Sequence, residues 1–177
     1  DSQRAYNQRV KEFYENIVNE EYGRYNSKYG VPISQYEEGQ SLTSIWAVKS
    51  LGIDPTTGKE IFLNRDGSVS DTWNATQEVV VGNTEPKFNG SVGFNLAYKA
   101  WSLFAAFQYE WGGQEYNQTL VDRVEDADLS RNVDERVLKG RWQKPGDHTF
   151  FKDIASRDRT EVTSRFVQDE NVLQFKS

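Results

Sequence analysis

The chain contains no cysteine and no methionine, and it has a single histidine. The missing cysteine excludes disulfide bonds, thiolate nucleophiles and cysteine-ligated zinc. The missing methionine predicts that the 177 residues are a processed or excised piece of a longer translation product. No apolar run reaches the ~18 residues that a transmembrane helix needs, whereas a transmembrane strand needs only about 9 to 11 residues and is not excluded.

Acidic residues are in excess and give the chain a net charge of −6. Binding to nucleic acid needs clustered Lys and Arg, but here the basic residues are interspersed with acids, so we expect no nucleic-acid partner. The length of 177 residues and the charged fraction of 27% are typical of one soluble globular domain. Whether this soluble character extends along the whole chain depends on the local pattern of apolar and polar residues.

No residue pattern indicates an active site. His148 stands in a loop without a second ligand or a nucleophile motif, and it is interpreted as solvated. The stretch NRDGS at 64–68 is interpreted as a hairpin turn, because an EF-hand calcium loop needs ligands spaced over about twelve residues. Acid–base catalysis needs a pocket that shifts pKa values, so the acidic pairs are interpreted as solvated surface. These pairs are Glu37-Glu38, Asp126 with Asp128, and Asp134-Glu135. We therefore expect no enzyme, no metal and no cofactor.

Residues 4–22 are predicted to form a helix, because Tyr6, Val10, Phe13 and Ile17 recur at helical spacing. Beyond Pro32 the pattern becomes extended. A strand is predicted within 41–53, turns follow in DPTTGKE, and Asp66-Gly67 predicts a tight hairpin. Pro86 argues against a central strand in its neighbourhood.

Two aromatic-rich strands are predicted between residues 92 and 111, joined around 99–102. Each has roughly ten residues, the length of a strand that crosses a membrane, and aromatic residues lie near the strand ends as in an interfacial girdle. A pair of core strands in a soluble β-sandwich would alternate in the same way, so both interpretations stay open on this evidence. The large side chains on the predicted lipid- or core-facing side are Phe94, Leu96, Tyr98, Phe107, Tyr109 and Trp111.

The last third of the chain has a different pattern. A helix is predicted within 114–145, where Leu129, Val133 and Val137 are interleaved with charged residues. A loop follows, and the tail 163–177 is predicted to form a strand.

Four stretches, read in order, resemble the SusC/RagA-type TonB-dependent outer-membrane transporters. They are YEEGQSLTSIWAVKSLGIDPTTGKEIF, NRDGSVS, VVVGNTEPKFNGSVGFNLAYKAWSLFAAFQYEWGGQEYN and TSRFVQDENVLQFKS. They are similar to the family's EGQSL run with its G-DP-TG turn, to the DG turn, to the GN-PKF-G element with its YKG-SL hairpin, and to its SRFV-D-NYLRLK strand. Departures from the family pattern occur at Ala100, Val172 and Phe175.

The resemblance implies a mainly β fold. Residues 36–177 would be part of the C-terminal half of a large transmembrane antiparallel β-barrel, with long extracellular loops and one or two short helices. Residues 99–102 would form a short periplasmic turn. Residues 1–35 are not matched, and we interpret them as a helical loop or boundary segment.

The resemblance also implies a location in the cell outer membrane, in contact with lipid, and a role in importing oligosaccharides or peptides. TonB would act through a plug region outside this chain, and a SusD-like surface lipoprotein would be the partner. Trp73, Trp142 and Phe150 are candidate contacts for the partner or the substrate, because aromatic side chains suit protein interfaces and stacking on sugar rings. The alternative is a soluble β-rich carbohydrate- or protein-binding domain without transport activity, in which the hairpin side chains would lie in a closed protein core.

Overall fold

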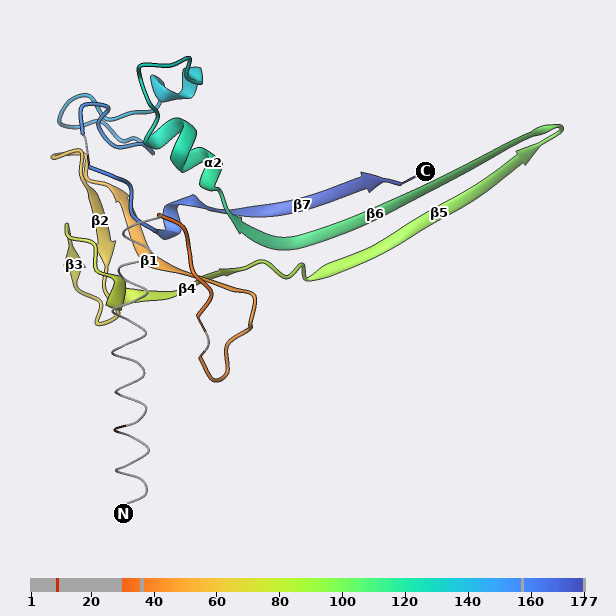
Figure 1. The fold of residues 1–177 in the computed structure, drawn as a ribbon, viewed down its shortest axis with the longest axis horizontal. Coiled ribbons are helices and arrows are strands. Elements are labelled where there is room, and N and C mark those ends of the chain that lie inside the picture. The colour runs from red at the N-terminus through yellow and green to blue at the C-terminus, as the bar shows by residue number, and fades with distance from the viewer. Residues whose placement is uncertain (1–8, 10–29, 36, 157, 177) are drawn as a thin grey trace.

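The computed structural model describes residues 9, 30–35, 37–156 and 158–176. Within them the chain is mainly β, and its strands form two antiparallel sheets (Figure 1). The predicted fold class is therefore confirmed. The helix predicted over 4–22 lies almost entirely outside the described residues. In the described part of the chain, no helix is both long enough and apolar enough to cross a membrane.

The first sheet has four strands in the order β3-β2-β1-β4. They are β1 (Ser44–Ile53), β2 (Glu60–Leu63), β3 (Val69–Ser70) and β4 (Glu78–Asn83). The predicted hairpin at Asp66-Gly67 joins β2 to β3, and Gly67 has a φ of 84° there. The Asp66 carboxylate accepts a hydrogen bond of 2.9 Å from the Ser68 amide, so it stabilises the turn, as the hairpin interpretation requires.

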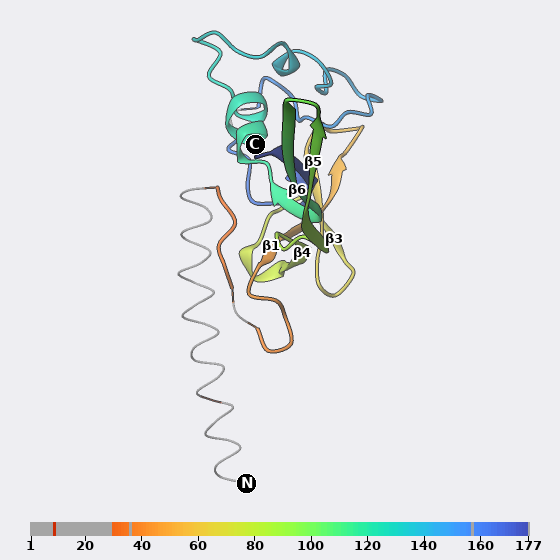
Figure 2. The same cartoon turned by 90° about the vertical axis from the view of Figure 1, so that its right-hand side faces the viewer.

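The second sheet has three strands in the order β5-β6-β7. They are β5 (Phe88–Tyr98), β6 (Trp101–Tyr116) and β7 (Val167–Phe175). The β5–β6 hairpin extends far from the rest of the protein (Figure 1), and Figure 2 looks along it. At about 3.3 Å per residue, the 11 residues of β5 span ~36 Å. The 11 residues of β5 agree with the predicted length of roughly ten, whereas β6 has 16 residues and is longer than predicted. The strand predicted within 163–177 is confirmed as β7.

The hairpin closes through Lys99 and Ala100 alone, since Tyr98 pairs directly with Trp101. The turn is thus tighter than the predicted 99–102 connection. Lys99 has a φ of 52°, which is uncommon for a residue with a β-carbon. Its ammonium lies 5.3 Å from the centre of the Tyr98 ring.

A β-bulge interrupts the pairing of β6 with β7 between Glu110 and Gly113. Gly112 supplies a φ of 81° at this point, and its amide donates a 3.0 Å hydrogen bond to the Asn171 side chain. A bulge bends a strand and increases its twist. It lets β6 continue from the long hairpin into the compact part of the protein, so β6 does not end near Trp111.

The segment after β6 forms only short helical turns. They are α2 (Gln118–Leu120), a π-helical turn (Val121–Glu125) and two 3-10 turns (Glu135–Val137 and Ser164–Phe166). The helix predicted through Leu129 and Val133 was wrong. Both side chains are exposed, and the Asp128 and Asp134 side chains accept hydrogen bonds from backbone amides two residues later, which favours turns over a continuous helix.

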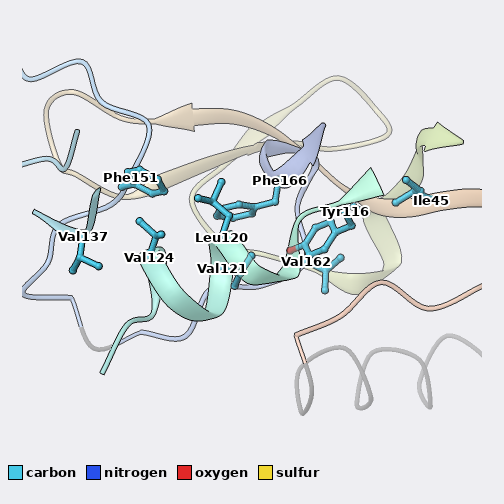
Figure 3. Packing of buried hydrophobic residues seen from close by; sticks show 10 residues of the cluster. Ile45, Tyr116, Leu120, Val121, Val124, Val137, Phe151, Val162 and Phe166 are labelled. Atoms are coloured by element: carbon cyan, nitrogen blue, oxygen red, sulfur yellow. The ribbon is translucent and has the colours of Figure 1, made fainter. Parts of the chain in front are cut away.

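The hydrophobic core lies where the first sheet, the helical turns and the start of β7 meet (Figure 3). The Tyr116 ring packs edge-on against the Phe166 ring with 6.1 Å between centres. The buried members of this core are Ile45, Ala47, Tyr116, Leu120, Val121, Val124, Val137, Phe151, Val162 and Phe166. None of them comes from the hairpin between Phe88 and Trp111, so the long hairpin lies outside the core.

A buried charge cluster joins the loops to the first sheet. The Arg165 guanidinium contacts Glu60 on β2 at 2.8 Å and Glu125 at 2.9 Å, and it lies 4.5 Å from the centre of the Phe166 ring. Burial by itself lowers the pKa of Arg165, but the two carboxylates outweigh burial and raise it. The Arg165 guanidinium therefore stays charged, and its two ion pairs connect segments that are far apart in sequence.

Candidate functional site

The register of β5, β6 and β7 sorts their side chains onto two faces of one sheet. Directly paired residues point to the same side, for example Leu96 with Leu103 and Tyr109 with Leu173. We call one side the apolar face: Phe88, Gly90, Val92, Phe94, Leu96, Tyr98, Trp101, Leu103, Ala105, Phe107, Tyr109, Trp111, Leu173 and Phe175. All six hairpin side chains predicted from the sequence are therefore brought together on one surface.

The apolar face is open to its surroundings. Leu96 is 57% exposed, Leu103 is 56% exposed and Trp101 is 81% exposed. Contiguous apolar patches of this kind are rare on water-soluble monomers and mark contact with a partner or a membrane. Nothing in the described chain packs over this face along the outer half of the hairpin, where both strands are exposed.

The opposite side of the hairpin is different in chemistry. We call it the polar face: Asn89, Ser91, Gly93, Asn95, Ala97, Ser102, Phe104, Ala106, Gln108 and Glu110. The Gln108 amide donates a 2.9 Å hydrogen bond to the Glu110 carboxylate along this face. The sheet thus presents apolar side chains on one side and mainly small or polar side chains on the other.

Aromatic side chains lie at both ends of the apolar face. Tyr98 and Trp101 flank the turn, and Phe88 pairs with Trp111 at the other end. Tyrosine and tryptophan prefer such positions at membrane–water interfaces, because their rings are apolar and their tips form hydrogen bonds. The apolar band of an outer-membrane barrel is ~25 Å tall, so the ~36 Å hairpin is long enough to span it.

The three aromatic residues predicted as ligand or partner contacts lie in the compact part of the protein. The Trp73 indole N–H donates to the Val162 carbonyl at 3.0 Å, and the Trp142 indole N–H donates to the Pro55 carbonyl at 2.9 Å. Both side chains are half-buried, so part of each ring serves to pack the loops. Phe150 is 42% exposed, a larger fraction than for either tryptophan, although its ring also packs against the Phe166 ring.

Among the acidic residues, Asp126 is not simply solvated surface, and that prediction was wrong for it. Its carboxylate accepts hydrogen bonds from the Lys152 ammonium at 2.9 Å and from the Thr160 amide at 2.8 Å. Asp128 and Asp134 are more exposed, in line with the prediction, and His148 is exposed. Within the described ranges, no three or more histidine or acidic side chains are placed to hold a metal ion.

Sequence reasoning missed Arg141, which is buried and organises the loops. It donates to the main-chain carbonyls of Val137 at 2.6 Å and Glu125 at 2.7 Å, and also to that of Val124. Burial lowers its pKa. Arg141 also lines a cavity of about 360 Å³ bordered by Asp126. No short sequence motif signals a cationic side chain that binds distant carbonyl groups.

No protein-family model matches the chain, and no curated protein sequence matches it. Among solved structures, it is similar to a chain of the RagAB peptide importer in the open-open state, with a TM-score of 0.62 and 17% identity over 82% of this chain and 18% of that chain. A chain in a structure of the RagAB peptide transporter gives a TM-score of 0.62 and 18% identity over 75% of this chain and 15% of that chain. A chain of the same importer in the closed-closed state gives a TM-score of 0.59 and 19% identity, again over 75% of this chain and 15% of that chain.

The chain therefore spans less than a fifth of the length of these structures. At such identities the likeness concerns the fold. Over 75–82% of its length, the chain is similar in fold to one segment of these RagAB chains.

Proposed function

We propose that the chain is part of a TonB-dependent outer-membrane transporter of the SusC/RagA type, which imports oligosaccharides or peptides together with a SusD-like surface lipoprotein. The observation that carries this proposal is the exposed apolar face of β5, β6 and β7, opposed by a polar face on the same strands. The four sequence stretches that resemble the family support it, and so does the fold likeness to chains named as a peptide importer.

Lipid is the environment that suits this sheet. β5 and β6 pair along the whole hairpin, and the outer edges of β5 and β7 would pair with further strands of the barrel, as backbone groups within the hydrocarbon layer require. Burying a large apolar side chain such as Leu96 is worth about 1.5–3 kcal/mol compared with leaving it in water. The polar face would then line the barrel interior, and the Lys99-Ala100 turn would lie on the periplasmic side.

The compact part of the protein would face the cell exterior. Trp73, Trp142 and Phe150 lie there, and we propose them as contacts for the lipoprotein or the substrate. TonB would act through a plug region that belongs to other parts of the parent protein. We assign no catalytic role and no cofactor to this segment.

Spin labels at single cysteines test the proposal, and the absence of native cysteine from this segment helps the design. Leu96→Cys and Leu103→Cys place labels on the apolar face, and Asn95→Cys and Ser102→Cys place matched controls on the polar face. The full-length protein that carries the segment is reconstituted in lipid vesicles. The measured quantity is how often each spin label collides with dissolved oxygen, which concentrates in lipid, and with a water-soluble nickel complex. We expect the labels at 96 and 103 to collide mainly with oxygen, and the labels at 95 and 102 to collide mainly with the nickel complex.

Labels at 96 and 103 that are shielded from both reagents would mean that protein covers the apolar face, and would favour the soluble binding domain. Equal access of the nickel complex at all four positions would contradict the membrane assignment. Uptake of labelled peptides and oligosaccharides by cells with and without TonB then tests transport. Uptake that persists at the same rate without TonB would exclude a TonB-dependent route.

A further inference from the structure

A cavity of about 400 Å³ lies in the compact part of the protein, between the start of β1, the segment that precedes it and the end of β6. Cavities of this volume are typical of sites for small ligands. Its wall is apolar at Ile33, Leu42 and Ile45, and polar at Ser44 and Glu115. The cavity lies beyond the paired part of the long hairpin, since the β6 residues in its wall come after the last β5–β6 pair.

Trp46 brings a buried hydrogen-bond donor to this wall. The residue is only 3% exposed, and its indole N–H has no hydrogen-bond partner among the described residues. A buried indole N–H normally has an acceptor, because a donor that leaves water without one costs free energy. An oxygen atom of a bound molecule would supply the missing acceptor.

A β-bulge explains why Trp46 reaches the cavity. The pairing of β1 with β4 shifts from Ile45–Gly82 to Trp46–Val80, and a bulge increases the local twist of a strand. Neighbouring residues on a regular strand point to opposite faces, yet Ile45 and Trp46 line the same cavity. The bulge therefore places an apolar side chain and an unpaired donor side by side.

The charge around the cavity has one sign. Glu115 and Tyr116 also line a second cavity of about 300 Å³, which Asp169 and Glu170 border as well. No lysine, arginine or histidine is among the described residues that line the two cavities. Glu115 has no ion pair within the described part of the chain. Coulomb attraction therefore favours a ligand that carries a positive charge.

We propose that this cavity binds the amino-terminal end of a peptide, an inference that rests on the proposed import of peptides. The terminal ammonium of the peptide pairs with the Glu115 carboxylate. The first side chain is apolar and packs against Ile33 and Ile45, and a backbone carbonyl oxygen accepts a hydrogen bond from the Trp46 indole. A neutral oligosaccharide offers hydroxyl groups but neither a cation nor an apolar side chain, so it fits this wall less well.

The test is peptide binding by the full-length protein that carries the segment, purified in lipid nanodiscs. The probe is the peptide Leu-Ser-Gly-Ser-Gly-Ser with a dye at its carboxyl end, and fluorescence anisotropy gives its Kd. Two matched probes are the same peptide with an acetylated amino group and the same peptide with glycine as its first residue. Each change should raise Kd roughly tenfold, because it removes a charge-assisted hydrogen bond or the burial of a leucine side chain.

Two substitutions separate recognition from a structural role. Glu115→Gln should raise Kd roughly tenfold for the free peptide but leave the acetylated peptide unchanged. Trp46→Phe keeps an aromatic ring and removes the N–H, so Kd should rise roughly three- to tenfold. The same change should not lower the unfolding midpoint without peptide, because the N–H has no partner there. Glu135→Gln, a control that removes an exposed charge outside both cavities, should change Kd less than twofold.

A cysteine in the wall tests whether the cavity is open in the full-length protein. Ser44→Cys places the thiol in the cavity, and Ser68→Cys places a control in the turn between β2 and β3. A water-soluble thiol reagent should modify both, and the peptide should slow modification at position 44 alone. A thiol at 44 that is shielded without peptide would mean that another part of the parent protein fills the cavity, which overturns the inference.

The remaining outcomes are distinct. An equal rise in Kd for the free and the acetylated peptide in Glu115→Gln overturns recognition of the ammonium group. An unchanged Kd in both Glu115→Gln and Trp46→Phe places the peptide elsewhere and overturns this site, while TonB-dependent uptake of peptides would leave the proposed transport intact. If the full-length protein neither binds nor takes up peptides, the proposed import of peptides fails and this inference fails with it.

Discussion

Replacing Arg165 by methionine should release the loops from the first sheet. The substitution keeps a long apolar side chain but leaves the carboxylates of Glu60 and Glu125 buried without their cation, with side-chain exposures of 10% and 0%. Removing one partner of a buried ion pair costs about 3–5 kcal/mol, because the remaining charge stays desolvated. The equilibrium constant for local opening should therefore rise by a factor of roughly 10² to 5 × 10³.

Hydrogen exchange of the folded protein measures this opening at two amides. Val48 donates to the Val162 carbonyl at 3.3 Å and Asn117 donates to the Phe166 carbonyl at 2.8 Å, so both bonds depend on the segment that carries Arg165. We expect both amides to lose protection by the same factor in Arg165→Met. A loss of less than tenfold would refute the reasoning, because the cluster would then not hold the segment in place.

The matched control is Arg136→Met. Arg136 binds Asp134 at 2.8 Å, but the two side chains are 60% and 37% exposed, so the pair should contribute less than about 1 kcal/mol. A second control removes the whole cluster with Glu60→Leu and Glu125→Leu added to Arg165→Met. It should recover most of the lost protection, because no buried charge is then left without a partner.

Three more results are expected. Gly58→Ala should lower the midpoint of unfolding by more than Gly67→Ala does. Both positions have positive φ, but only at Gly58 would an added β-carbon lie 2.6 Å from the Trp142 side chain. Equal effects of the two substitutions would exclude this clash as the cause. Lys99→Gly should stabilise the hairpin by up to ~1 kcal/mol by relieving a φ of 52°, and a lower midpoint of unfolding would contradict this. Burial raises the pKa of Glu161, so its ionised form opposes folding above the unfolded value of 4.5. Glu161→Gln should therefore raise the unfolding midpoint at pH 7 but not below pH 4.5, and a gain that is independent of pH would contradict the assignment.

The sequence predicts the local elements well. The alternation from Val92 to Trp111 predicts the hairpin and its faces, and Asp66-Gly67 predicts the first turn, because strand periodicity and turn chemistry depend on residues close in sequence. The full length of β6 could not be predicted, since the bulge at Gly112 depends on the Asn171 side chain of another strand.

The loops after β6 and the buried polar groups depend on distant contacts. Arg165 lies 105 positions from Glu60 and 40 from Glu125, and no short motif specifies such pairs. The apolar spacing of Leu129, Val133 and Val137 suggested a helix, but only Val137 enters the core. The sequence likewise predicts a solvated Asp126, because only the fold brings Lys152 and Thr160 beside its carboxylate.

The two-residue turn at Lys99 has a consequence for the order of folding. Every pair from Tyr98–Trp101 to Phe88–Trp111 is nested around this turn, so the hairpin can form on the ~1–10 µs scale of local hairpins. The core needs Phe166 and Val162 to reach Ile45 across most of the chain, and contacts of such high sequence separation form slowly. The β5–β6 part of the apolar face should therefore assemble before the core closes and before β7 pairs with β6, and during that interval the open edges of these two strands are prone to aggregate.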